Sequence, residues 1–381
     1  MSMPIYLDYN ATTPVAPAVI DAIRPFLAEH FGNPSSSHAY GITARQAVAE
    51  ARASVAALIH AREDEIIFTG SATEANNLAL LGVACALGLT RRHLLISAIE
   101  HPAVMQPAQH LREMGWELTV VPVNGDGRVD PRTVAAAVRA DTGLVSIMHA
   151  NNEVGTIQPI AEIARLVRPM GVLLHTDAAQ SAGKVELNVD ALGVDLLTLA
   201  GHKFYATKGV GALYVRAGTP IKPIFFGADQ EHGLRPGTEN VPLVVGMGAA
   251  ARLARERLPE VTEKLRALRD ALHKRLAAAV PGLVLNGHST ERLPNTLHVS
   301  FPGIDGRELL SRIAGQVAAS VGSACHSGSE AVSGVLAAMG CDADRARGAV
   351  RLSVGWMSTP EEIEAAAAAL SEAAAGLLVS R

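Results

Sequence analysis

The stretch VLLHTDAAQSAGKVELNVDALGVDLLTLAGHKFYATKGVGALYV, residues 172–215, decides the fold class of this chain. It contains three apolar runs of strand length, Val172–His175, Leu196–Leu199 and Gly211–Val215. Polar groups follow the first two runs directly, where the chain would leave the edge of a sheet. Short apolar runs that alternate with helical patterns are typical of an α/β protein with a mostly parallel sheet.

The alternation extends toward the N-terminus, and beyond residue 240 the pattern changes. Further strands are predicted over Ile66–Thr69, His93–Ala98, Glu117–Val123 and Leu144–His149, with helices such as Pro131–Ala140 and Ile160–Val167 between them. A helical stretch, Pro242–Ala279, follows the α/β region. After it, short strands (Thr296–Ser300 and Ala349–Val354) mix with helices and predict a second, smaller α+β unit.

The composition limits the class of protein. Of the 381 residues 49% are hydrophobic, and the formal net charge is -4, which indicates a large core and argues against a nucleic-acid binder. The longest apolar run, Leu78–Leu89, is too short to cross a bilayer, and the N-terminus does not resemble a signal peptide. The three cysteines, Cys85, Cys325 and Cys341, are too widely spaced for a disulfide framework or a zinc ribbon. We therefore expect a cytoplasmic protein without a metal site, in which Cys85 and Cys341 are buried core thiols.

Four polar groups follow predicted strands, and open α/β sheets bind ligands at the carboxyl ends of their strands. These groups are Glu100–Pro102, Asn151–Glu153, Asp177–Gln180 and Gly201–Lys203. Lys203 is either a surface lysine or an amine of lowered pKa that forms a Schiff base. Asp177 either caps a helix or faces a cation such as the ring nitrogen of pyridoxal phosphate, with Gln180 near the phenolic oxygen of the ring.

Four other features each have a structural and a functional interpretation. Gly70–Thr73 opens a helix, so its backbone either is simply capped or binds an anion. His101 is structural, or it stacks on a planar cofactor and moves protons. Arg351 pairs with an internal carboxylate, or it binds the carboxylate of a substrate. Cys325 is buried and inert, as most cysteines are, or it is an accessible nucleophilic thiol, which its position among Gly, Ser and Ala favours.

Eight motifs together resemble the cysteine desulfurases of the class V aminotransferase family, which are fold type I enzymes that depend on pyridoxal 5'-phosphate. They are GNPSS (32–36), ATEANN (72–77), ANNEVG (150–155), HTDAAQ (175–180), GHKF (201–204), RPGTEN (235–240), GSAC (322–325) and VRLSVG (350–355). The resemblance implies a large domain, residues 15–255, with a mostly parallel seven-stranded sheet flanked by helices. Residues 1–14 and 256–381 would form a smaller α+β domain with the cysteine loop at about 320–334.

The family pattern assigns roles to the matching positions. Lys203 would be the Schiff-base lysine, His101 would stack on the cofactor ring, and Cys325 would take up sulfur as a persulfide. Arg351 would hold the substrate carboxylate, with Asn152 close by. The cofactor would be held by Ala72, Thr73, His101, Asn152, Asp177, Gln180, His202, Lys203 and Thr238.

The function implied by the resemblance is conversion of L-cysteine to L-alanine, with the sulfur passed from Cys325 to an acceptor protein. The acceptor stays open between an iron–sulfur scaffold, a carrier for tRNA thiolation and a protein of a specialised pathway. Thr238 would reach the phosphate site of the other subunit, so the resemblance also implies a homodimer. Selenocysteine lyase is one alternative, and an aminotransferase or cysteine lyase that does not use Cys325 is another. An alternative of a different class is a non-catalytic scaffold that retains the fold.

The chain departs from the family pattern at three places. Ala200 stands where many desulfurases have a serine, so one phosphate contact is expected to be missing. Ala206 and Thr207 replace the usual Gly-Pro, and the cysteine loop lacks the usual Pro-Ser near its end. In having a histidine, His326, directly after the cysteine, the chain resembles the selenocysteine lyases. A dehydrogenase is disfavoured, because the chain has no GxGxxG fingerprint.

Overall fold

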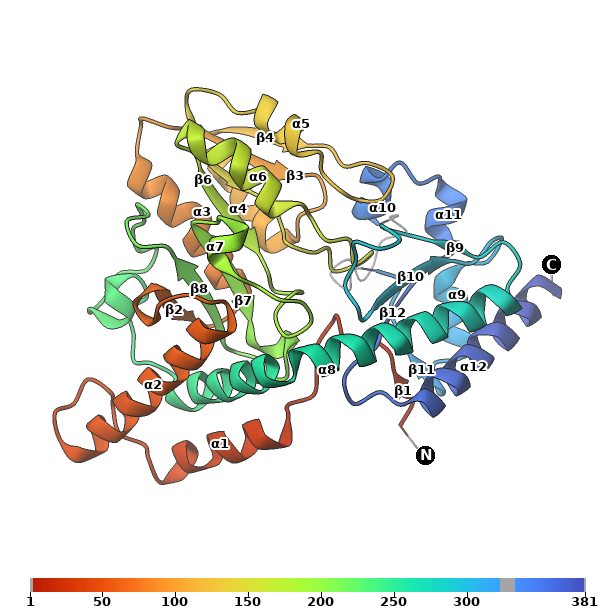
Figure 1. The fold of residues 1–381 in the computed structure, drawn as a ribbon, viewed down its shortest axis with the longest axis horizontal. Coiled ribbons are helices and arrows are strands. Elements are labelled where there is room, and N and C mark those ends of the chain that lie inside the picture. Colours follow the sequence, from red (N-terminus) through yellow and green to blue (C-terminus); the bar gives the residue numbers. More distant parts are fainter. Residues whose placement is uncertain (1–2, 323–332, 380–381) are drawn as a thin grey trace.

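A computed structural model describes residues 3–322 and 333–379 of the chain. At its centre lies a seven-stranded sheet in the order β2-β8-β7-β6-β5-β3-β4 (Figure 1). The strands are β2 (Ile66–Thr69), β3 (His93–Ser97), β4 (Glu117–Val121), β5 (Thr142–Ser146), β6 (Leu173–Asp177), β7 (Leu196–Ala200) and β8 (Gly211–Val215). The α/β fold class and the mostly parallel sheet predicted from the sequence are confirmed.

One strand, β8, runs antiparallel to both of its neighbours, β2 and β7, and the other neighbouring pairs are parallel. Strand β2 is therefore parallel to β7. Thr69 and Ala200, which end β2 and β7, both pair with Gly211, the first residue of β8. The carboxyl ends of β2, β3, β5, β6 and β7 thus lie at one edge of the sheet.

Helices cover both faces of the sheet. Successive side chains of a strand point to opposite faces, so strands with consecutive apolar residues pack against helices on both sides. On one face, Leu94 and Ile96 of β3 pack in a cluster with α3 and α4. On the other face, Leu95 of the same strand joins a larger cluster with α2, α6 and the first part of α8. The helices are α1 (Pro17–Ala28), α2 (Ala39–Leu58), α3 (Ala72–Leu87), α4 (Pro102–Glu113), α5 (Pro131–Ala136), α6 (Ile160–Val167), α7 (Val189–Leu192), α8 (Val241–Ala279), α9 (Gly306–Arg312), α10 (Gly334–Ala338), α11 (Ala343–Arg347) and α12 (Pro360–Val379), with 3-10 turns η1 (Glu63–Glu65), η2 (Arg168–Met170), η3 (Gly201–Lys203) and η4 (Gln230–Gly233).

A second hydrophobic cluster surrounds a small antiparallel sheet in the order β12-β10-β9. Its strands are β9 (Val284–Leu285), β10 (Thr296–Ser300) and β12 (Ala349–Ser353), and a separate parallel pair joins β1 (Ile5–Tyr6) to β11 (Val317–Ala318). Helix α12 and the second part of α8 cover this sheet (Figure 1).

The long helix α8 runs from the first cluster to the second (Figure 1). Ala254 belongs to the first cluster and Val261 to the second. The N-terminal segment also contributes to both, since Leu7 lies in the second cluster and Tyr9 in the first. We propose that residues 15–255 form the large domain, and that 1–14 and 256–381 form the small one.

The prediction that Cys85 is a core thiol is wrong, because its side chain is exposed. Cys85 lies near the end of α3 on the solvent side, while Leu78 and Val83 form the buried side of that helix. An apolar helix sequence alone does not show which residues face away from the sheet. Cys341 is half-buried beside a small cluster, and this burial raises the pKa of its thiol.

The close approach of β8 to the start of α3 yields a first test. A Cβ atom at Gly211 would lie 2.6 Å from the carbonyl carbon of Ser71 and 2.8 Å from the amide nitrogen of Ala72. We expect Gly211→Ala to lower the free energy of unfolding by about 1–3 kcal/mol, because the backbone of Ser71 and Ala72 would have to shift to make room for the added Cβ. Chemical denaturation measures this change. The control is Gly125→Ala, where an added Cβ would meet no atom within 4 Å; equal effects of the two substitutions would contradict the prediction.

Candidate active site

Most of the predicted site residues lie at the shared edge where five strands end. Helix α3 begins there directly after β2, and Ser71 caps it by accepting a hydrogen bond from the amide of Glu74 at 3.1 Å. Ala72 and Thr73 occupy the first turn, and Thr73 is exposed. The first amides of a helix have no acceptor within the helix, so this turn is a natural anion-binding position.

Lys203 ends the short turn η3 that follows β7. Its Nζ donates hydrogen bonds to the carbonyl oxygens of Asn10 at 2.5 Å and Ala11 at 2.8 Å. The lysine side chain is thus held against the N-terminal segment at the edge of the sheet. His202 beside it is hydrogen-bonded through Nδ1 to Thr12 Oγ1 at 3.1 Å. Burial, reinforced by the positive charge of Lys203, lowers the pKa of His202 to about 4.

Asp177 is the last residue of β6, and its side chain is buried. Its Oδ2 accepts a hydrogen bond from Asn76 Nδ2 at 2.7 Å, and its Oδ1 accepts one from the amide of Ala179 at 2.9 Å. It forms no ion pair with any residue of the described ranges. A buried carboxylate without a cationic partner is costly, so this position suits a ligand that carries positive charge.

His101 caps α4, and its Nδ1 accepts a hydrogen bond from the amide of Ala103 at 3.1 Å. Burial lowers the pKa of His101, the charge of Asp177 opposes this shift, and the charge of Lys203 adds to it. Asp177 and Lys203 therefore each lie within electrostatic reach of His101. The imidazole is neutral at pH 7 and so has the protonation state required of a base.

Gln180 and Asn152 lie at the same edge and share contacts with the N-terminal segment. Gln180 Nε2 donates to the carbonyl of Asn10 at 3.0 Å, while its buried Oε1 has no hydrogen-bond partner among the described residues. The carbonyl of Asn152 accepts from Arg351 Nη1 at 3.0 Å. These contacts place Arg351, from β12 of the small sheet, beside the carboxyl edge of the large sheet.

Arg351 is almost fully buried, with 3% of its side chain exposed. Its Nη2 forms an ion pair with Asp8 at 2.7 Å, so the internal carboxylate considered from the sequence does exist. Its Nε is buried and has no partner in the described part of the chain. The guanidinium is thus oriented by one carboxylate and retains donor capacity for a second.

Two predicted site residues are not brought to this cluster within the described chain. Thr238 is exposed and lines a separate hollow beside Phe31 and Pro34. Cys325 lies outside the described residues. Thr238 and the other predicted cofactor ligands therefore occupy different parts of one subunit.

Comparisons with known proteins place these features in a family. The family model "Aminotransferase class-V" matches residues 5–366. The chain belongs to the class-V aminotransferase family. It is 45% identical to a cysteine desulfurase IscS of Dictyoglomus turgidum, over 95% of this chain and 92% of the relative. It is also 46% identical to a cysteine desulfurase IscS of Anaeromyxobacter sp. (strain Fw109-5), over 96% of this chain and 91% of the relative.

Solved structures of relatives share the whole architecture. A NifS-like protein superposes with a TM-score of 0.93 at 38% identity, covering 98% of this chain and 100% of the other. SspA in complex with cysteine superposes with a TM-score of 0.82 at 34% identity, covering 92% of this chain and 98% of the other. The prediction of a class V aminotransferase fold is thereby confirmed.

The class-V aminotransferase family depends on pyridoxal phosphate, and the site fits that cofactor in three respects. The carboxylate of Asp177 suits the protonated ring nitrogen, because no protein cation pairs with it in the described ranges. The first turn of α3 suits the phosphate. The amine of Lys203 lies at the same edge, as Schiff-base formation requires.

Asn10, to which the sequence alone assigns no role, lies at the centre of the site. Its side chain is 1% exposed and accepts from Asn295 Nδ2 at 2.9 Å. Its own Nδ2 donates to Thr296 Oγ1 at 2.9 Å and to the Asn152 carbonyl at 3.2 Å. Only the position of Asn10 within a family motif could have drawn attention to it, because a lone asparagine after a short strand is not distinctive.

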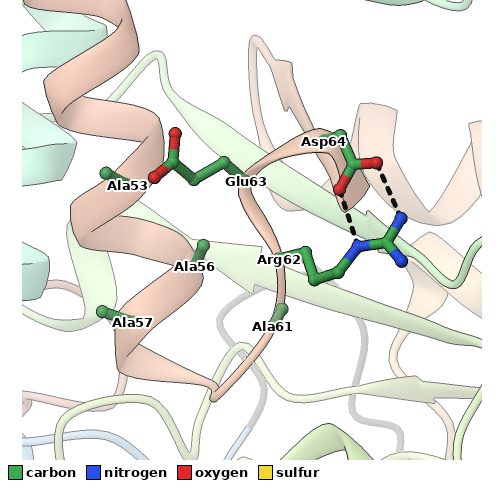
Figure 2. A pocket seen from close by; sticks show the side chains of 7 residues that line it. All are labelled: Ala53, Ala56, Ala57, Ala61, Arg62, Glu63 and Asp64. Carbon is green, nitrogen blue, oxygen red and sulfur yellow. Dashed lines mark hydrogen bonds and ion pairs between the residues drawn. The ribbon is translucent and has the colours of Figure 1, made fainter.

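The hollow drawn in Figure 2 lies away from these residues. It is lined by alanines of α2, by Ala61, and by Arg62, Glu63 and Asp64, and Arg62 pairs there with Asp64. None of the predicted site residues lines it. No group of three or more metal-ligating side chains occurs within residues 3–322 and 333–379. The helices described in those ranges include none of the length and apolarity needed to cross a membrane.

Glu100, next to His101, is a buried carboxyl group with an altered acidity. Its Oε1 accepts hydrogen bonds from Ser97 Oγ and from the amide of Met148, and its buried Oε2 has no partner among the described residues. Burial raises the pKa of Glu100 from 4.5 to about 8. The folded chain therefore holds a proton on Glu100 at neutral pH, which the unfolded chain releases.

This raised pKa predicts a pH dependence of stability. Between pH 4.5 and 8 the folded state binds more protons than the unfolded state, so the contribution of Glu100 to stability falls as the pH rises. Glu100→Gln retains an acceptor and cannot ionise. We therefore expect its free energy of unfolding to fall less between pH 5.5 and pH 8.5 than that of the wild type. Denaturant titrations at the two pH values measure the difference. The exposed Glu113→Gln is the control, and a pH slope left intact by Glu100→Gln would refute the prediction.

Removal of the Asn10 side chain is expected to destabilise the site. Asn10→Ala removes the nearer of two acceptors of the buried Asn295 amide and leaves it only the Val354 carbonyl at 3.3 Å, so the free energy of unfolding should fall by about 1–3 kcal/mol. Asn77→Ala is the matched control, since the Asn77 side chain bonds only within α3. Denaturation curves of both variants measure the two losses. A loss at Asn10 no larger than at Asn77 would contradict the central place of Asn10.

Proposed function

We propose that this chain is a pyridoxal phosphate-dependent cysteine desulfurase, which converts L-cysteine to L-alanine and retains the sulfur as a persulfide on Cys325. The observation that carries the proposal is the convergence of Lys203, Asp177 and His101 at one sheet edge, with Arg351 entering from the small sheet. Relatives that match over more than nine-tenths of the chain bear the name cysteine desulfurase.

When bound, pyridoxal phosphate supplies an electron sink for the carbon that loses its proton. Asp177 would hold positive charge at the ring nitrogen, and Gln180 and Asn152 would lie toward the ring oxygen. Ala72 and Thr73, in the first turn of α3, would hold the phosphate together with His202, and Thr238 of the partner subunit would complete that site in a homodimer. Ala200 contributes no hydroxyl to this set.

Arg351 and Lys203 act directly on the substrate. The guanidinium of Arg351, oriented by Asp8, binds the carboxylate of L-cysteine with Asn152 beside it. The amine of Lys203, assisted by the neutral imidazole of His101, takes the α-proton of the substrate and returns a proton to the product.

Sulfur transfer belongs to Cys325. Its thiolate attacks the substrate sulfur, so that a sulfur–sulfur bond forms as the carbon–sulfur bond of the substrate breaks, and the electron pair of that bond stays with the carbon skeleton. Protonation of that skeleton gives alanine, and the persulfide passes to an acceptor protein. A cytoplasmic location belongs to the same proposal, because a reducing compartment keeps thiols such as Cys325 out of disulfides.

Substitution of Cys325 tests the proposal. Cys325→Ala should lose nearly all sulfide and alanine production from L-cysteine while it keeps the cofactor absorption band, because Lys203 and Asp177 are unchanged. Mass spectrometry of the wild type should find one added sulfur on Cys325 after exposure to L-cysteine. Cys85→Ala, at an exposed thiol, is the control. Alanine production by Cys325→Ala at the wild-type rate would overturn the assignment, and a strong preference for L-selenocysteine would favour the lyase.

A further inference from the structure

Two aromatic side chains join the part of the fold that carries Lys203 to the part that carries Arg351. Tyr205 follows Lys203 by two residues, and Trp356 follows Arg351 by five. Their rings stack with centroids 4.0 Å apart and planes inclined by 15°. Trp356 packs against both hydrophobic clusters, whereas Tyr205 belongs to the large one.

Polar contacts hold the stacked pair in place. The amide of Trp356 donates a hydrogen bond to Tyr205 Oη at 2.8 Å. The two residues are therefore joined by a directional hydrogen bond as well as by the stacking of their rings. From α8, Lys264 Nζ donates to the carbonyl of Trp356 at 2.5 Å, and the guanidinium of Arg257 lies 4.8 Å from the centre of its ring. Helix α8 spans both clusters and therefore braces the pair from outside.

The backbone at Tyr205 is held in an unfavourable conformation. Its φ is +70°, in the left-handed region that a bulky residue rarely adopts. The amide of Tyr205 donates to Thr13 Oγ1 at 2.9 Å, and its carbonyl accepts from the amide of Ala16 at 3.1 Å. Such strain persists where the surroundings enforce it and is concentrated at functional sites. Here it sets the direction in which the chain leaves Lys203.

We propose that Tyr205 and Trp356 are positioning residues that fix the separation between Lys203 and Arg351, and hence the fit of an α-amino acid between its amine and its carboxylate. The inference rests on the proposed function, which gives Lys203 and Arg351 these two ends of the substrate. Neither aromatic residue needs to touch the substrate in order to act, because each restrains the segment of its neighbour.

Hydrogen exchange of the full-length purified chain tests the coupling directly. Trp356→Leu should speed amide exchange in residues 201–206, on the other side of the stack, by about threefold to tenfold, as expected for loss of an aromatic pair. Trp356→Phe retains a ring and should restore slow exchange. The control is Trp116→Leu, at the other tryptophan of the chain, which is buried in the α3–α4 cluster and should leave residues 201–206 unchanged.

Steady-state kinetics of the same variants provide a second readout. Trp356→Leu should raise KM for L-cysteine by about tenfold while kcat changes less, because Lys203 and Arg351 are intact and only their separation is less restrained. Trp356→Phe should recover most of the loss. A wild type that forms no alanine from L-cysteine would refute the proposed function, whereas the exchange result would still decide the positioning role.

A gentler variant covers the case in which Trp356→Leu does not fold. Tyr205→Phe keeps the stack and removes only the oxygen that accepts from the Trp356 amide. It should speed exchange of that amide and raise KM in the same direction by a smaller factor. Unchanged exchange at residues 201–206 in a folded Trp356→Leu, or an equal change in Trp116→Leu, would overturn the inference, as would unchanged exchange of the Trp356 amide in Tyr205→Phe.

Discussion

The backbone carbonyl of Asn10 is the point on which the site depends. It accepts hydrogen bonds from Lys203 Nζ and from Gln180 Nε2, both at the edge of the large sheet. The side chain of the same residue bonds to Asn295 and Thr296, beside and within the small sheet. One buried residue is therefore hydrogen-bonded to both halves of the site and fixes their relative position. The N-terminal segment is able to do this because Leu7 packs in one hydrophobic cluster and Tyr9 in the other.

Burial also controls the charge of the site. It lowers the pKa of His101 and His202, and the buried His149 and His175 behind them have pKa values lowered to about 4. Lys184, buried below Gln180, has a pKa lowered to about 7 by burial and by the charge of Lys203. The histidines are consequently neutral at pH 7. In the proposed mechanism, a neutral His101 imidazole beside Asp177 is able to take a proton, whereas several imidazolium ions would repel the amine of Lys203.

The sequence predicted the sheet well because strand and helix periodicities differ. Gly211–Val215 and Ile160–Val167 have the predicted bounds, and the polar groups after β3, β5, β6 and β7 do meet at one edge. Long-range contacts were not predictable in this way. The reversal of β8 follows from its pairing with β2 and β7, and the partnership of Arg351 with Asp8 joins residues more than 300 positions apart. Cys85 shows the same limit, since the apolar run from Leu78 to Leu87 predicts a helix but does not show which of its residues face solvent.

The pairing of Arg351 with Asp8 bears on the substrate binding proposed for Arg351. An arginine side chain that is mobile before binding loses conformational entropy when it closes on a carboxylate. Here the guanidinium is already fixed by Asp8 and by the carbonyl of Asn152, so that loss is incurred on folding. A second carboxylate then meets a donor of fixed direction but must share its charge with Asp8. In the proposed function, this arrangement favours selection of the substrate by position over strength of attraction, which is the role proposed for the restraint between Arg351 and Lys203.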